Sequence, residues 1–232
     1  MSEPTATALK PAAYRRTNVK SVTSMAMLTA IAYVVMLLSK LLPQISGFLQ
    51  LDLKDTIICI GGFVFGPLSA AAIAIVVAVV EMFTVSDTGP IGLIMNMLAT
   101  CAFCCTASLV YRKRHTKGGA ILGLSLGVVM LTAVMLLWNY LITPLYMGIS
   151  REAVAAMLVP VMLPFNLVKG GLNMAIVLLL YKPVVSALRK AKLVPDSQSV
   201  GISKQSNTGY LLFSAALLAT FVTLALTLMG IL

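Results

Sequence analysis

The sequence is poor in charge and nearly free of histidine. Asp, Glu, Lys and Arg together make up 10% of its residues, and His115, in a basic run, is its one histidine. A zinc protease with an H-E-x-x-H motif needs two histidines, and a single histidine within a basic run does not indicate a Ser-His-Asp triad. The sequence also lacks a Walker A phosphate-binding loop. We therefore predict that the protein is not an enzyme and hydrolyses no nucleotide itself.

Cysteine is also sparse, and its positions do not favour a metal site. The four cysteines all lie within apolar runs, at Cys59, Cys101, Cys104 and Cys105. The spacing Cys101-x-x-Cys104 occurs in redox and metal sites, but no histidine or carboxylate accompanies it. Free thiols packed inside a membrane helix are the expected state, and we predict no metal ligands.

Apolar residues dominate what remains. The chain has 232 residues, 59% of them hydrophobic, and its mean hydropathy of +0.99 exceeds what a soluble core requires. The formal net charge of +10 would suit nucleic acid, but the basic residues gather between apolar runs, where they fix topology and contact anionic lipid headgroups. We predict an all-α, multi-pass protein of the cell membrane that binds the lipid bilayer and no nucleic acid.

Seven apolar runs are candidate membrane helices. The second is short, and Gly66-Pro67 separates it from the third by a tight turn, because a single helix through both would be too long for one span. The runs cover residues 21–42, 56–65, 68–82, 91–111, 119–142, 161–180 and 209–232. The connector 145–159 has its own apolar stretch, which fits a short interfacial helix.

These runs predict the organisation of the chain. We expect a cytoplasmic N-terminal tail at 1–20, a six-helix membrane core at 21–190, a polar linker at 191–208 and an additional transmembrane helix at 209–232. With the N-terminus in the cytoplasm, thirteen basic residues lie inside and three outside, with Lys169 left at membrane depth. Positive charge in short loops marks the cytoplasmic side, so this orientation is favoured.

The sixth run carries polar side chains where hydrocarbon is expected. Asn166, Lys169 and Asn173 fall at i, i+3 and i+7, so a helix places all three on one face. An ammonium at membrane depth is costly unless it is paired or lines a cavity, which favours a binding site. The alternative is a Lys near a helix end whose ammonium reaches the interface. We predict that this stripe lines a pocket.

Other residues are expected near the same pocket. The predicted orientation brings Asn139 and the apolar loop 48–55 to the outer face, together with the start of the sixth run. Asn96 either lines a cavity or bonds to a neighbouring helix. Amides donate and accept hydrogen bonds whereas Lys only donates, so Asn139, Asn166 and Lys169 suit a flat heteroaromatic ligand with carbonyls and ring nitrogens.

Five motifs occur together between residues 21 and 190. They are Leu51-Asp52-x-x-Asp55, Gly61-Gly62-Phe63-Val64-Phe65-Gly66-Pro67, Thr88-Gly89-Pro90-Ile91-Gly92 with Met95-Asn96, Asn139-Tyr140 with Thr143-Pro144, and Pro164-Phe165-Asn166-x-x-Lys169. As a set they resemble the riboflavin-specific substrate-binding (S) component of energy-coupling factor (ECF) transporters. The resemblance implies an S component with six helices and a vitamin pocket near the outer face, closed by the first loop.

The resemblance also implies partners and site residues. Riboflavin would be the transported substrate and not a cofactor, and a transmembrane coupling subunit with two cytoplasmic ATPases would energise its uptake. Asn139, Asn166 and Lys169 match family positions that bond the flavin, and Leu51 matches the covering loop. With Asn96 and Asn173 they form the predicted substrate-binding set.

Two further features concern the ends of the chain. Ala26-x-x-x-Ala30 resembles the motif of the first helix that docks on the coupling subunit, since small residues let another helix approach closely. The helix after residue 208 departs from the family pattern, so the resemblance implies no role for it.

Three alternatives stay open. An S component for a different vitamin would share the fold, because the pocket decides the ligand. A stand-alone ion-coupled carrier would need no ATPase partner. A seven-helix retinal photoreceptor would use Lys169 as its Schiff-base lysine, although no acidic counter-ion stands out on a neighbouring run.

Overall fold

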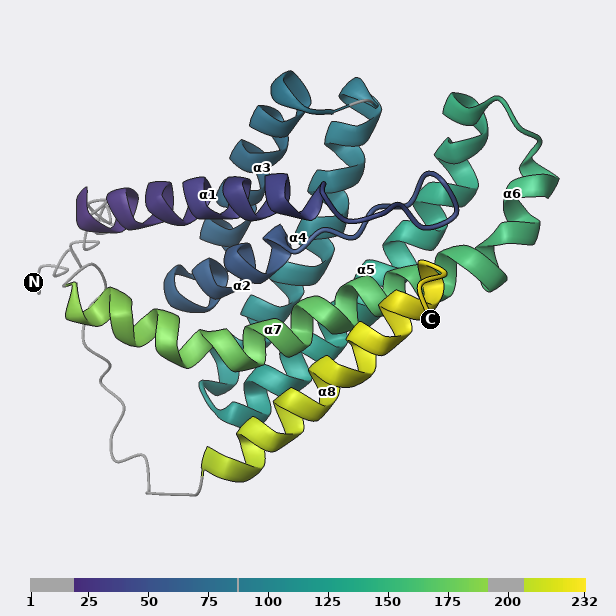
Figure 1. The fold of residues 1–232 in the computed structure, drawn as a ribbon. Helices are drawn as coiled ribbons and strands as arrows, with labels where there is room; N and C mark the ends of the chain where they lie inside the picture. The colour runs from purple at the N-terminus through teal and green to yellow at the C-terminus, as the bar shows by residue number, and fades with distance from the viewer. Residues whose placement is uncertain (1–18, 87, 192–206) are drawn as a thin grey trace, which may run out of the picture.

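A computed structural model describes residues 19–86, 88–191 and 207–232, and they form a bundle of helices (Figure 1). The elements in chain order are α1 (Val19–Ser39), α2 (Lys54–Phe65), α3 (Pro67–Thr84), α4 (Gly89–Arg114), α5 (Lys117–Met147), α6 (Arg151–Met157), a π-helical turn η1 (Leu158–Met162), α7 (Leu163–Lys190) and α8 (Asn207–Leu228). The predicted all-α class is confirmed. Most of the predicted tail 1–20 and linker 191–208 lies outside the described residues.

Six stretches of the described chain are long and apolar enough to cross a membrane. They are α1, α3, α4, α5, the continuous run from α6 to the end of α7, and α8. The predicted short second helix is α2, whose 12 residues fall below that length. It ends where Gly66 adopts φ 99°, a conformation that favours glycine, and Pro67 then begins α3.

The region around α6 differs in detail from the sequence-based expectation. Helix α5 runs through Pro144 and ends at Met147, before the left-handed Gly148. The predicted interfacial helix is the seven-residue α6, whose first turn is capped because Ser150 Oγ accepts a hydrogen bond from Ala153 N at 3.2 Å. Helix α7 extends ten residues beyond the predicted end of its run, because Val185 and Leu188 continue its buried face.

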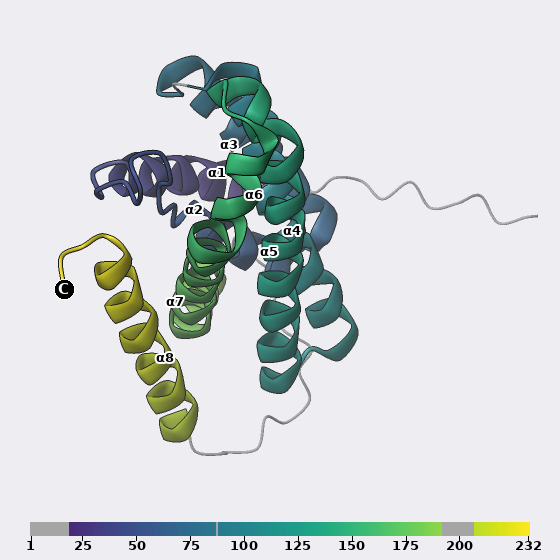
Figure 2. The same cartoon turned by 90° about the vertical axis from the view of Figure 1, so that its right-hand side faces the viewer.

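Helix α7 lies between α5 and α8, and α8 runs beside it in both views (Figures 1 and 2). Two consecutive glycines allow this close packing. A Cβ at Gly170 would lie 3.1 Å from Val128 Cγ1 on α5, and a Cβ at Gly171 would overlap the ring of Phe221 on α8. Small residues let membrane helices approach in this way.

The larger of two apolar clusters contains buried residues of the five helices α1, α2, α3, α4 and α5, and of α7. Leu28, Ile58, Phe103, Leu124 and Val177 are at most 2% exposed and belong to one cluster. A second, smaller cluster lies at the end of the bundle where α1 is joined to α2. That connection, the α1–α2 loop (residues 40–53), is held in shape by Ile45 and Leu49, which exchange backbone hydrogen bonds of 2.7 and 3.0 Å.

A candidate ligand-binding cavity

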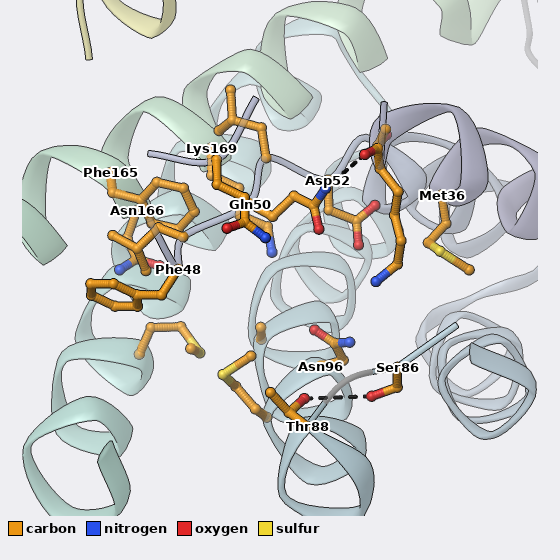
Figure 3. Close-up of a pocket in the computed structure, with 18 of the residues that line it drawn as sticks. Met36, Phe48, Gln50, Asp52, Ser86, Thr88, Asn96, Phe165, Asn166 and Lys169 are labelled. Atoms are coloured by element: carbon orange, nitrogen blue, oxygen red, sulfur yellow. Dashed lines mark hydrogen bonds between the residues drawn. The ribbon is translucent and has the colours of Figure 1, made fainter. Parts of the chain in front are cut away.

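A cavity of about 320 Å³ lies beneath the α1–α2 loop (Figure 3). Its other walls are formed by residues towards the ends of α1, α3 and α5 and towards the starts of α4 and α7. Residues that line it include Met36, Phe48, Leu49, Gln50, Leu51, Asp52, Glu81, Met95, Asn96, Met135, Asn139, Phe165, Asn166 and Lys169. Its volume is within the range of small-molecule pockets, roughly 300–1,000 Å³.

The structure brings together five of the six residues predicted from the sequence. Leu51, Asn96, Asn139, Asn166 and Lys169 line this one cavity. They come from the α1–α2 loop, α4, α5 and α7, so the fold gathers positions that are up to 118 residues apart in the sequence. Asn173 is not among the lining residues and has a different position, described below.

Lys169 places an ammonium group in the cavity. Its side chain is on α7, the residue is 9% exposed, and its ammonium has neither a hydrogen-bond nor an ion-pair partner in the described part of the chain. Burial alone would raise the pKa of the Asp52 carboxyl, but the nearby ammonium groups of Lys54 and Lys169 hold that pKa below its ordinary value. A largely buried donor therefore faces the cavity.

The side-chain amides of Asn166 and Asn139 differ in how many of their hydrogen-bonding groups already have partners. Asn166 Nδ2 donates to the Met162 carbonyl at 2.7 Å, and its Oδ1 has no hydrogen-bond partner among the described residues. Asn139 Nδ2 donates to the Met135 carbonyl at 2.7 Å, and its Oδ1 accepts a hydrogen bond from Thr143 Oγ1 at 2.9 Å. Asn166 thus offers an open acceptor, whereas the amide of Asn139 is engaged on both sides by its own helix.

Asn96 was predicted either to line a cavity or to bond to a neighbouring helix, and in the structure it does both. It lines the cavity, and its Nδ2 donates to Glu81 Oε2 on α3 at 3.0 Å. The amide therefore links α4 to α3 at the floor of the site.

Asn173 lies one turn further along α7 and joins the helix to the loop and to α2. Its Oδ1 accepts a hydrogen bond from Thr56 Oγ1 at 2.8 Å. Its Nδ2 donates to the backbone carbonyls of Asp52 and Lys169, at 2.8 and 3.0 Å. With 1% exposure and these three partners, Asn173 supports the cavity wall from behind.

A buried ion network beside the cavity was not predicted. Lys54, only 1% exposed, pairs with Glu81 at 3.0 Å and also with Asp52, while Lys40 lies 3.6 Å from Glu81. Glu81 within an apolar run was the signal that could have indicated it, because an acid at membrane depth requires a partner. The network fixes the start of α2 against the end of α3.

The α1–α2 loop is tied at its base and packed on its apolar side. The Leu53 backbone N–H donates to Ser39 Oγ at 3.1 Å, and Gln50 Nε2 donates to the Lys40 carbonyl at 3.1 Å. Ile45, Leu49 and Leu51 from this loop form the second apolar cluster with Phe165, Val168, Leu172 and Ala225. The loop thus forms a folded cover over the cavity.

The geometry can bind a ligand by polar and apolar contacts. The lining combines the Lys169 ammonium, which has no hydrogen-bond or ion-pair partner among the described residues, with amide groups, thioethers and the rings of Phe48 and Phe165, which belong to the same apolar cluster. In the part of the chain that the structure describes, no group of three or more His, Cys, Asp and Glu side chains could hold a metal ion.

Comparison with known proteins agrees with this architecture. The chain is 29% identical to the riboflavin transporter RibU of Staphylococcus aureus over 178 residues, which cover 74% of the chain and 93% of that protein. It is 28% identical to the riboflavin transporter FmnP of Bacillus subtilis over 188 residues, 76% of the chain and 99% of that protein.

A solved structure is similar as well. It is described as the S component of a bacterial ECF transporter, and it matches with a TM-score of 0.63 and 27% sequence identity over 74% of this chain and 98% of its own. The family model for the substrate-specific component of ECF transporters matches residues 20–181. This family consists of transporter components and not of enzymes. Since the match spans well over half of the sequence, the chain belongs to the substrate-specific components of ECF transporters.

Proposed function

We propose that the protein binds riboflavin in the cavity beneath the α1–α2 loop and mediates its uptake across the membrane. The observation that carries the proposal is the pair formed by Lys169 and Asn166 in one cavity, an ammonium with no hydrogen-bond or ion-pair partner and an amide oxygen with no hydrogen-bond partner among the residues that the structure describes. A ligand that accepts hydrogen bonds from one and donates to the other would satisfy both groups.

Riboflavin has the complementary chemistry. Its flat ring system carries carbonyl oxygens and ring nitrogens that accept from an ammonium, and an imide N–H that donates to an amide oxygen. The rings of Phe48 and Phe165 supply aromatic surface at the same site. The names of the relatives, riboflavin transporters that match about three quarters of this chain, support the same ligand.

The energy for uptake is proposed to come from partner subunits. The sequence lacks a nucleotide-binding loop, so a transmembrane coupling subunit and two cytoplasmic ATPases would drive reorientation of the loaded protein. The proposed docking surface is the Ala26 and Ala30 face of α1. Both alanines are exposed in the described bundle, which leaves room for another helix to pack closely against α1.

The proposed orientation places the N-terminus in the cytoplasm and the cavity near the outer face. The asymmetry of Lys and Arg supports it, because thirteen of these residues then lie inside and three outside. The cavity would accept riboflavin from the outside, and reorientation in the assembled transporter would release it on the inside.

The decisive experiment identifies the small molecule that copurifies with the full chain. We expect flavin absorption bands that remain with the protein and are released on denaturation, and mass spectrometry should return riboflavin. A different vitamin in the released fraction would contradict the ligand assignment. A covalent retinal adduct trapped by borohydride would instead favour the photoreceptor.

Energisation needs a separate test in cells. Riboflavin uptake should stop when the ATPase partners are deleted. Uptake that persists without them would favour a stand-alone ion-coupled carrier and contradict this part of the proposal.

A further inference from the structure

Helix α8 begins after the part of the chain that the family accounts for. The family model ends at residue 181, and the relatives match about three quarters of the chain. Nevertheless α8 has a continuous inward face with helical spacing, which contributes to both apolar clusters. Its members are Tyr210, Ser214, Leu217, Leu218, Phe221, Ala225 and Leu228, and Met229 follows directly after the helix.

Contacts fix α8 to α7 along its length. At the start of α8, Tyr210 Oη donates to the Leu178 carbonyl at 3.1 Å, and Lys182 Nζ lies 5.8 Å from the centroid of the Tyr210 ring. In the middle, the ring of Phe221 lies where any side chain at position 171 would be. Gly171 is two residues after Lys169, so this contact supports the segment of α7 that carries the cavity lysine.

At the cavity end, α8 also completes the apolar cluster under the α1–α2 loop. Ala225 is 5% exposed and belongs to the same cluster as Ile45, Leu49 and Leu51 of the loop, and Phe165 of α7. Leu228 and Met229 pack against this cluster. Leu49, Leu51 and Phe165 line the cavity too, so one set of side chains both contacts the site and packs in the cluster that α8 completes.

We propose that α8 is a brace for the ligand site, and that Phe221 and Leu228 are positioning residues that hold the α1–α2 loop closed over the cavity. The loop must open for a ligand to enter or leave, and opening disrupts the apolar cluster that α8 completes. Because entry and exit both require this opening, the brace slows ligand capture as well as ligand release. The identity of the released ligand rests on the proposed function, whereas the closed state of the loop does not.

The test uses the full chain in lipid nanodiscs. It combines two substitutions at one contact, of which the first removes a side chain and the second adds a methyl group in the same place. Phe221→Ala removes the ring, and Gly171→Ala places a methyl group where the ring lies. The double variant relieves the overlap, so its effect should be smaller than the sum of the two single effects. Leu228→Ala probes the cavity end of α8. Phe213→Ala is the matched control, because Phe213 is on the same helix, is 46% exposed and belongs to neither apolar cluster.

Two measurements test the proposed role of α8, one without ligand and one with riboflavin. Hydrogen exchange of the loop amides in the ligand-free protein reports closure directly, through the bonded N–H groups of Ile45 and Leu49. We expect exchange about threefold to tenfold faster in Phe221→Ala, Gly171→Ala and Leu228→Ala, and unchanged in Phe213→Ala. Release and association of riboflavin, followed by its fluorescence, should both accelerate by a similar factor, because each requires the loop to open.

The outcomes distinguish the two proposals. If the parent protein does not bind riboflavin, the ligand assignment fails while loop exchange still reports on the brace. If folded Phe221→Ala and Leu228→Ala variants show loop exchange and riboflavin release like the parent, α8 is only a membrane anchor and the brace is wrong. Acceleration in Phe213→Ala equal to that in Phe221→Ala would contradict it as well.

Discussion

The ammonium of Lys54 lies 3.0 Å from Oε2 of Glu81, and both side chains are less than 10% exposed. This ion pair joins the first residue of α2 to α3, and Asn96 extends the connection to α4 through the same carboxylate oxygen. These polar contacts therefore connect three of the helices around the cavity, α2, α3 and α4.

Loss of the Glu81 carboxylate should destabilise the folded protein. Glu81→Ala removes one of the two acid partners of Lys54, whose ammonium keeps Asp52, and the loss of one hydrogen bond to a buried charge costs about 1.5–3 kcal/mol. Denaturant unfolding in detergent measures the change. Glu152→Ala, at an exposed position on α6, is the control and should unfold like the parent. Equal stability of the two variants would argue against the network.

Removal of the Lys169 ammonium should weaken riboflavin binding without unfolding the protein. Lys169→Met keeps the aliphatic length and deletes the donor, so the expected loss is about 1–3 kcal/mol, the scale for one buried hydrogen bond. Titration of flavin fluorescence measures it. Lys190→Met, at the exposed end of α7, should bind like the parent. A Lys169→Met variant that also binds like the parent would rule out the proposed contact.

The two amides should contribute unequally. Asn166 has an open Oδ1, whereas both amide groups of Asn139 are already bonded on α5. We expect Asn166→Ala to weaken riboflavin binding by about 1–3 kcal/mol and Asn139→Ala to weaken it by less. The same titration compares the two variants. The reverse order would show that Asn139 turns towards the ligand on binding.

Asn173 should contribute to the stability of the ligand-free protein. Asn173→Ala and Thr56→Val each break the 2.8 Å bond between their side chains, so each should lower the unfolding free energy, by about 1–3 kcal/mol. Because the two residues share that bond, the double variant should lose less than the sum of the single losses. Strictly additive losses would contradict the contact between α2 and α7.

A bulky residue on the exposed face of α1 should separate binding from uptake. Ala30→Phe leaves the cavity unchanged but blocks close approach of a partner helix, so riboflavin binding should persist while uptake in cells falls several-fold. Ala215→Phe adds the same bulk to the exposed face of α8 and is the control. Normal uptake by Ala30→Phe would exclude this face as the docking surface.

Much of this architecture could be predicted from patterns close together in the sequence. Gly66-Pro67 indicated that α2 is short, because this pair interrupts a run too long for one span. Asn166 and Lys169 indicated a cavity, because polar groups at helical spacing are costly in hydrocarbon. Each of these signals involves residues close together in the sequence. In the structure α2 ends just before Gly66-Pro67, and Asn166 and Lys169 line a cavity.

The remaining features depend on partners that are distant in the sequence. Lys54 was assigned to an outer loop, but it begins α2 and is buried because Glu81, 27 residues later, is within reach. Asn173 shares the face of Lys169, yet it bonds to Thr56 and to the Asp52 backbone, since the loop and α2 approach α7 at that depth. The contact between Phe221 and Gly171 likewise has no local signal.

The Leu53 backbone N–H donates to Ser39 Oγ, so the two ends of the α1–α2 loop are held together and the segment between them is a loop closed at its base. Lengthening such a segment is inexpensive, about 0.6 kcal/mol for each doubling of its length. Residues of the loop other than the buried Ile45, Leu49 and Leu51 can therefore diverge between related proteins while the helices keep their positions. A bundle built in this way can acquire a different substrate by changing its cover and a few lining residues, without changing the surfaces that face the membrane.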